Sequence, residues 1–284
     1  MDKIRSVVVI SDTHCGCKLG LCPPEVALDE GGTYHHSLLQ AKVWAYWIDF
    51  WENWIPRVTK GEPYVIVHNG DVIDGVHHQS VTQISQNLTD QKRIAEEVLR
   101  PLINGVALVD GKPGYYHIRG TEAHVGKSGQ DEEEVAKTLG AIPDENGNHA
   151  RWDLWLRLDG ALIHFCHHIG TTSSAAYEST AVWKEMVEAY NEAGRSGEEP
   201  PDVVVRSHRH RHFKTEVSTN KGNGISLVTP GWQLKTPFVW RGALGRTGTP
   251  EIGGCVIRAG SEGEDNVYTR FKVWKIQRTP PVCL

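Results

Sequence analysis

The stretch IRSVVVISDTH, residues 4–14, decides the fold class of this chain of 284 residues. Its first part, residues 4–11, is a β-branched apolar run, which predicts a strand that is buried on both faces. Asp12 and His14 follow where this strand ends. Polar side chains at the carboxyl end of a buried strand are typical of an open α/β sheet, because ligands bind there.

Strands and helices alternate along the rest of the chain. Short apolar runs predict further strands at 64–69, 115–119, 202–207, 225–230, 254–259 and 267–276. Residues 152–158 and 161–167 predict a hairpin that turns at Asp159-Gly160. Apolar residues at helical spacing predict helices over 37–55, ending at Pro56, and over 83–103, 131–139 and 176–193. This order predicts an α/β (α+β) domain with mixed sheets.

The whole chain, residues 1–284, is predicted to be one domain. The most linker-like stretch is AGRSGEEPP, residues 193–201, but a predicted strand follows it at once. Roughly 35 residues separate the two later His-rich stretches, which is long for a connection. We therefore expect residues 170–200 to form a lid or cap over a site.

The composition excludes several classes of protein. The 35 acidic and 30 basic residues give a net charge of -5, which disfavours a broad nucleic-acid-coating surface. A membrane span needs about 18 consecutive apolar residues, and no stretch approaches that length. The apolar run near the start is too short for a secretory signal, and the six Cys form no repeated CxxC pair. We expect a reduced, intracellular, cytoplasmic protein without a membrane partner.

The chain has 15 His, the side chain that most often binds metals. Most of the unusual polar residues stand at the ends of predicted strands, namely Asp12 and His14, Asp71 and Asp74, Glu122 and His124, His167 and His168, and His208, His210 and His212. Carboxylates that meet in one crevice raise each other's pKa unless a cation neutralises them. Carboxylate and imidazole donors suit Mn, Fe, Zn, Co or Ni. These donors exceed the need of one ion, so we expect a pair about 3.5–4 Å apart.

The order of these blocks resembles the calcineurin-like metallophosphoesterases. Their signature is D-x-H, G-D-x-x-D, G-N-H-[DE], a strand-end His, and G-H-x-H. Residues 12–210 keep this order, with Ser207 in place of the last Gly. The third block differs, because Gly120-Thr-Glu122-Ala-His124 replaces G-N-H, and it is similar to the G-T-E-x-H block of phage-type members. The resemblance implies a four-layer α-β-β-α sandwich with two mixed β-sheets.

The resemblance also implies a role for each strand-end residue. One ion would be bound by Asp12, His14 and His210, the other by Glu122, His167 and His208, and Asp71 would bridge the two. His124 would be the catalytic residue, which stabilises phosphoryl charge or protonates the leaving alkoxide. Asp74 would orient a ligand rather than bind an ion. The adjacent His168 and the later His212 stay open as alternatives to His167 and His210.

The expected activity is that of a dinuclear metal-dependent phosphoester hydrolase, in which a hydroxide shared by both ions attacks phosphorus in line. Manganese is the preferred metal, with Fe, Zn, Ni or Co as alternatives. We expect Arg119, His77 and His168 to contact the substrate phosphate. The basic stretch RHRHFK favours a phosphodiester, either a nucleic acid or a nucleotide. The alternatives are a phosphomonoesterase, a hydrolase with one ion, and a catalytically silent binding module.

Overall fold

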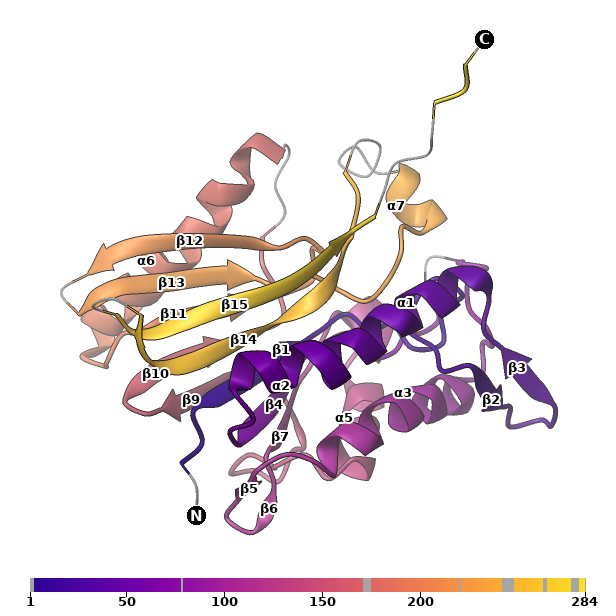
Figure 1. Ribbon diagram of the computed structural model, residues 1–284, viewed down its shortest axis with the longest axis horizontal. Coiled ribbons are helices and arrows are strands. Elements are labelled where there is room, and N and C mark those ends of the chain that lie inside the picture. Colours follow the sequence, from indigo (N-terminus) through magenta and orange to yellow (C-terminus); the bar gives the residue numbers. More distant parts are fainter. Residues whose placement is uncertain are drawn as a thin grey trace.

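The structure of the protein is a computed structural model that describes residues 3–77, 79–170, 175–219, 221–241, 248–262, 265–276 and 281–283. Two mixed sheets dominate the described part of the chain (Figure 1). One has the order β15-β14-β1-β4-β7-β8, built from β1 (Ser6–Ile10), β4 (Tyr64–Asn69), β7 (Tyr115–Ile118), β8 (Ala150–Arg151), β14 (Glu251–Glu262) and β15 (Asp265–Lys275). Strands β1, β4, β7 and β8 run parallel, whereas β14 lies antiparallel to both β1 and β15.

The second sheet has the order β12-β13-β11-β10-β9, built from β9 (Leu154–Leu158), β10 (Ala161–Phe165), β11 (Val203–Arg206), β12 (Phe213–Thr219) and β13 (Gly222–Val228). Strands β10, β11 and β13 are parallel to one another. The predicted hairpin is β9–β10, and it turns at Asp159 (φ 51°) and Gly160 (φ 99°) as expected. Two small hairpins pair β2 (Glu25–Ala27) with β3 (Thr33–His35) and β5 (Leu108–Val109) with β6 (Lys112–Pro113).

Helices cover the outer face of each sheet. The described helical segments are α1 (Leu38–Ile48), the π-helical η1 (Asp49–Trp54), α2 (Ile55–Thr59), α3 (Leu88–Ile103), α4 (Glu122–Val125), α5 (Gln130–Thr138), the 3₁₀ turn η2 (Ala175–Tyr177), α6 (Glu178–Ser196) and α7 (Pro237–Arg241). In Figure 1, α1, α3 and α5 lie on one side of the molecule, and α6 lies on the opposite side. No helix among the described residues is both long and apolar enough to cross a bilayer.

Alternate residues of β1 pack into different cores. Val8 and Ile10 join a cluster with residues of the helices, including Trp47 of α1. Val7 and Val9 join a second cluster that includes Phe165 of the other sheet. Because successive side chains of a strand point to opposite faces, β1 is buried between helices and a second sheet. This packing confirms the expected four-layer α-β-β-α sandwich.

Three helix boundaries differ clearly from the sequence-based expectation, and one strand of the second sheet was not expected. The helix over 37–55 does not end at Pro56, since this Pro occupies the first turn of α2, where no backbone N–H is needed. Helix α3 begins at Leu88, after the N-cap Asn87, and not at 83. Helix α6 continues to Ser196, into the stretch expected to be a linker. Strand β12 was not predicted, because its FKTEVST sequence lacks a buried apolar run.

The segment expected to form a lid, residues 170–200, lies partly outside the described residues, since 171–174 are not among them. Its larger part is α6, which packs against β11, β12 and β13. Val182 of α6 contacts a small apolar cluster with Val228 of β13. Residues 178–196 therefore form the outer layer of the second sheet.

Candidate metal centre

The carboxyl ends of parallel strands bring the predicted residues together. Asp12 and His14 follow β1, Asp71 follows β4, His167 follows β10, and His208 and His210 follow β11. Their donor atoms form two groups, one of Asp12, His14 and His210 and one of Asp71, His167 and His208, and within each group they lie within 4.8 Å of one another. The first group consists of residues expected at one ion, and the second joins Asp71 to two residues expected at the other ion.

In the first group, Nε2 of His210 lies 3.2 Å from Oδ1 of Asp12 and 3.1 Å from Nε2 of His14. Oδ1 of Asp12 is buried and has no hydrogen-bond partner. His14 turns its other ring nitrogen towards Oδ1 of Asp74, at 3.4 Å. A buried carboxylate oxygen and two ring nitrogens that face one another fit a divalent cation, which would satisfy all of them.

In the second group, Nε2 of His167 lies 3.0 Å from Oδ2 of Asp71, and Nδ1 of His208 lies 4.0 Å from the same oxygen. The Nδ1–H of His167 donates to the backbone carbonyl of Asn69 at 2.6 Å. This bond fixes the ring so that Nε2 faces Asp71, an arrangement common in metal-binding His. A Cβ at Gly70 (φ 91°) would overlap His167, so Gly is required there.

The two groups adjoin each other. Nε2 of His167 lies 4.0 Å from Oδ1 of Asp12, and the backbone N–H of His208 donates to Oδ2 of Asp12 at 3.4 Å. The donors therefore form one continuous lining, and they suit two neighbouring ions rather than two separate sites.

Without an ion, protons take its place between the acidic and imidazole groups. Burial lowers the pKa of His167, but the Asp71 carboxylate outweighs this effect and raises that pKa to about 10. Burial raises the pKa of Asp71, and His167 and His124 more than compensate, so this pKa is far below its usual value. The pKa of Asp12 is lowered in the same way, chiefly by His210. Both carboxylates are thus charged although they are buried, as metal ligands need to be.

The backbone is strained at these ligands. Asp12, His14, Asp71, His208 and His210 all have positive φ, between 41° and 72°. Side chains other than Gly occupy this left-handed region at a cost, and such residues gather at functional sites.

A third group of donor atoms joins His14, Asp74 and His124 at the edge of the first. The Nδ1–H of His124 donates to the Asp74 carbonyl at 2.6 Å, so its Nε2 carries the lone pair. Burial lowers the pKa of His124 to about 4. Near neutral pH this ring is therefore a proton or metal acceptor, and it can protonate a leaving group only after substrate charge raises its pKa.

Asp74 holds several side chains in place. Its Oδ1 accepts from Gln233 at 3.0 Å, and its Oδ2 accepts from Gln83 at 2.9 Å. These bonds fix the Asp74 carboxylate beside the ring of His14. His77 lies 3.6 Å from Oδ2 of Asp74, and its ring contacts that of His124.

The third block departs from the prediction. Glu122 is exposed at the start of α4 and belongs to none of the donor groups found among the described residues. Its neighbour Thr121 lies inside the second group. Oγ1 of Thr121 is 3.1 Å from Oδ2 of Asp71 and 3.1 Å from Nδ1 of His208. Glu122 thus lies away from the donor atoms that it was expected to join, because the first turn of α4 directs the side chain of 121 inwards and that of 122 to solvent.

Arg119 does not reach the centre either. Its guanidinium donates to the carbonyls of Ala150 and Ser128 at 2.9 and 3.0 Å, and it lies over the ring of Trp152. These bonds hold its guanidinium against other loops, away from the donor atoms of the centre. His168 is exposed, and its ring lies 5.2 Å from that of His167 and 5.7 Å from that of His208. It therefore stands where a substrate group could contact it.

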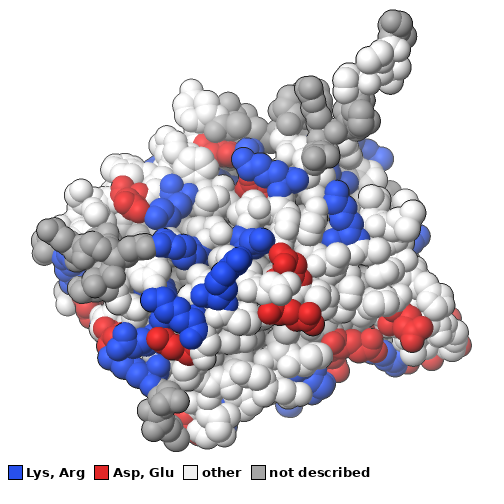
Figure 2. All heavy atoms as spheres, in the orientation of Figure 1, with Lys and Arg blue, Asp and Glu red and all other residues white. Residues whose placement is uncertain are grey.

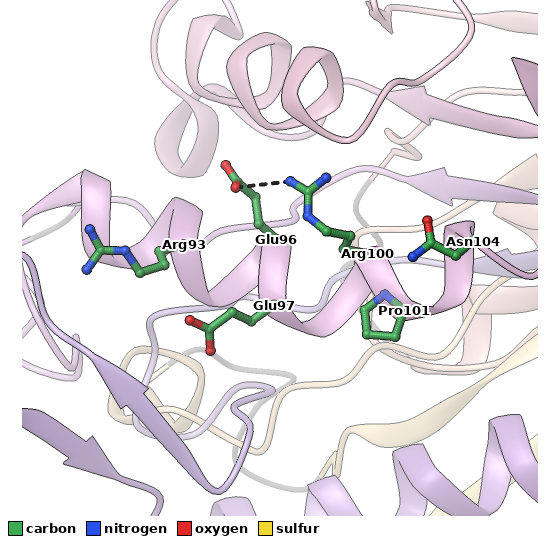
Figure 3. Close-up of a pocket in the computed structure, with 6 residues that line it drawn as sticks. All are labelled: Arg93, Glu96, Glu97, Arg100, Pro101 and Asn104. Atoms are coloured by element: carbon green, nitrogen blue, oxygen red, sulfur yellow. Dashed lines mark hydrogen bonds and ion pairs between the residues drawn. The ribbon is translucent and has the colours of Figure 1, made fainter.

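Figure 3 shows a surface hollow along α3 that is separate from these residues. Its lining consists of Arg93, Glu96, Glu97, Arg100, Pro101 and Asn104. Arg100 pairs with Glu96 at 3.4 Å. This hollow contains no convergent His and carboxylate donors, so the strand-end centre remains the better candidate site.

No family model matches the chain, and no curated protein matches it. Solved structures of similar fold include a predicted phosphoesterase of Streptococcus pneumoniae, with 11% identity, coverage of 95% of this chain and 98% of the other, and a TM-score of 0.34. Vps29 of Chaetomium thermophilum is 12% identical, with coverage of 98% of this chain and 99% of the other and a TM-score of 0.40. A phosphatase of Mycoplasma pneumoniae is 10% identical, with coverage of 97% of this chain and 95% of the other and a TM-score of 0.39. Such scores do not assign an activity, so function must be inferred from the site.

Proposed function

We propose that the chain is a dinuclear metal-dependent phosphoester hydrolase of the calcineurin-like type. The observation that carries this proposal is the continuous lining of buried carboxylates and imidazoles around Asp12 and Asp71. Charged buried carboxylates are costly unless they bind cations, and the Asp12 oxygen that accepts no hydrogen bond marks where one would sit. The resemblance of the motif order supports the same reading.

In this proposal, the strand-end residues hold the two ions. Asp12, His14 and His210 would hold one ion, His167 and His208 would hold the other, and Asp71 would contribute to both. The hydroxyl of Thr121 takes the place expected for Glu122. When bound, divalent cations would activate a water nucleophile and neutralise charge on phosphoryl oxygens.

His124 and His168 would act on the substrate. His124 lies beside the first group with its Nε2 lone pair available, so it would accept a proton or, once protonated, donate to the leaving oxygen. His168 would contact a phosphoryl oxygen from the exposed side of the second group. Asp74 would keep the rings of His14 and His124 in place.

We favour phosphodiesters as substrates and manganese as the metal. Three arginines of the stretch 206–211 are engaged, since Arg206 pairs with Glu185, Arg211 pairs with Glu178, and Arg209 donates to the Gly170 carbonyl. The local positive charge is therefore partly neutralised. Figure 2 shows basic and acidic side chains together on one face of the molecule. These charges suit a nucleotide or a small diester better than a long nucleic acid.

The test combines metal content with turnover. The protein is loaded with manganese, and elemental analysis should find two ions per chain. Hydrolysis of bis-(p-nitrophenyl) phosphate should exceed that of the monoester, and a chelator should abolish both. Asp71→Asn should lose metal and turnover, whereas the control His149→Asn, in a loop outside the centre, should keep both. A chain that binds no metal and cleaves neither ester would refute the proposal and favour a binding module.

A further inference from the structure

A second cluster of titratable residues is buried behind the metal centre. His68 of β4, His117 of β7 and Glu132 of α5 are fully buried, and their donor atoms lie within 4.8 Å of one another. His68 and His117 are paired on neighbouring parallel strands, and their rings stack at 4.8 Å with an angle of 15° between the planes.

This stacking disfavours a third metal site. A ring nitrogen binds a cation in the plane of its own ring. Two nearly parallel stacked rings therefore cannot both direct their lone pairs at one ion. The cluster has to be explained by its hydrogen bonds.

Glu132 connects two of the loops that carry metal ligands. Its Oε1 accepts the backbone N–H of Val72 at 3.0 Å, and its Oε2 accepts the backbone N–H of Gly120. Val72 follows Asp71, and Gly120 precedes Thr121. One carboxylate thus holds the second and third ligand loops at a fixed separation.

These two loops are packed so tightly that small displacements matter. A Cβ at Gly120 would overlap both the backbone N and the Oδ1 of Asp71. The backbone N–H of Thr121 donates to the same Oδ1 at 2.6 Å. This bond leaves Oδ2 of Asp71 directed towards His167 and His208. The orientation of Asp71 therefore depends on where the 120–121 backbone lies.

The imidazoles extend the connection to the first ligand loop. Nε2 of His117 lies 3.3 Å from Oε1 of Glu132, and its Nδ1 bonds Tyr115 Oη at 2.6 Å. His68 bonds Oγ1 of Thr13 at 3.1 Å, and Thr13 in turn donates to the Val72 carbonyl at 2.9 Å. Thr13 lies between Asp12 and His14, so all three loops meet in this network.

We propose that Glu132 is a positioning residue that sets the geometry of the second cation group by holding the Asp71 and Thr121 loops together. This inference rests on the proposed dinuclear centre. A carboxylate is required, because each of its oxygens accepts one backbone N–H. A Gln at this position would turn its NH₂ towards one of the two N–H groups and release that loop.

The experiment is a manganese titration of the full chain with calorimetry, together with melting curves with and without metal. Glu132→Gln should weaken binding of the second ion by about 10–100-fold and that of the first ion less, because Asp12, His14 and His210 do not bond Glu132. The matched control is Glu134→Gln on the same helix, whose exposed side chain pairs with Lys92 and should change neither affinity. Val98→Ala, in the buried face of α3, is the control for a loss of stability alone.

A purely structural role would lower the melting temperature of the metal-free protein but leave the increase caused by manganese unchanged, as in Val98→Ala. A positioning role reduces that increase in Glu132→Gln. If Glu132→Gln does not fold, Glu132→Asp keeps the charge but cannot reach both loops, and it should show the same selective loss. Unchanged affinity for the second ion in the folded variant overturns the inference. A wild-type chain that binds no manganese overturns the proposed function itself.

Discussion

The proton that lies between His167 and Asp71 when no cation is bound gives the stability of the metal-free protein a characteristic pH dependence. The pKa of His167 is about 10 in the folded chain, against 6.5 for an ordinary His. A raised pKa in the folded state contributes stability that is complete below pH 6.5 and is lost as the pH rises through 10. At about 1.36 kcal/mol for each pKa unit, this loss is on the order of 5 kcal/mol.

The assay is urea denaturation in the presence of a chelator at several pH values between 6.5 and 10. Wild type and His167→Gln are compared, because Gln cannot take up the proton but fills a similar space. The stability advantage of wild type should shrink by several kcal/mol across this range. With manganese bound, the stability of the wild type should instead increase with pH, since the ion displaces the proton and binds more tightly as the pH rises. Equal pH slopes for the two proteins would refute the reasoning.

Three further substitutions probe individual groups of the centre. Thr121→Val should weaken binding of the second ion while Thr121→Ser retains it, because the hydroxyl is the part of the side chain that bonds Asp71 and His208; a calorimetric titration in which Val and Ser behave alike would contradict this. His124→Ala should lower turnover by about 10²–10⁴-fold and keep two ions, whereas loss of one ion by elemental analysis would show that His124 is a ligand. Gly70→Ala should destabilise the protein by about 1–3 kcal/mol, since the new Cβ overlaps His167, and an unchanged denaturation midpoint would show that the loop yields.

The main features of the fold could be predicted because they depend on local patterns. The apolar run at 6–10 is buried on both faces, and the polar residues that follow it mark the strand end. Since parallel strands end at the same edge, Asp12, Asp71 and His208 could be expected to meet. Pro56 was expected to end a helix, but it lies in the first turn of α2. The sequence alone does not distinguish a Pro that ends one helix from a Pro that begins the next.

The finer parts of the centre depend on contacts that spacing does not reveal. Thr121 and Glu122 are adjacent, and only the direction in which α4 begins decides which one faces Asp71. Arg119 was expected to bind phosphate, but carbonyls of other loops use its guanidinium. Glu132 is one of three acids in the first turn of α5, where the helix dipole favours acidic residues whatever their contacts. Its bonds to Val72 and Gly120 join segments far apart in the chain, so a local pattern cannot show them.

The left-handed backbone conformation at the ligands lowers the stability of the fold, whereas the side chains of these residues are needed to bind metal. Gly at Asp12, His14, Asp71, His208 or His210 would relieve about 1–2 kcal/mol at each position, because it lacks the Cβ that disfavours this conformation. Each such change would also delete a donor atom. Mutagenesis that screens only for thermal tolerance would therefore tend to erase the centre, and libraries made to stabilise this protein should leave these positions untouched.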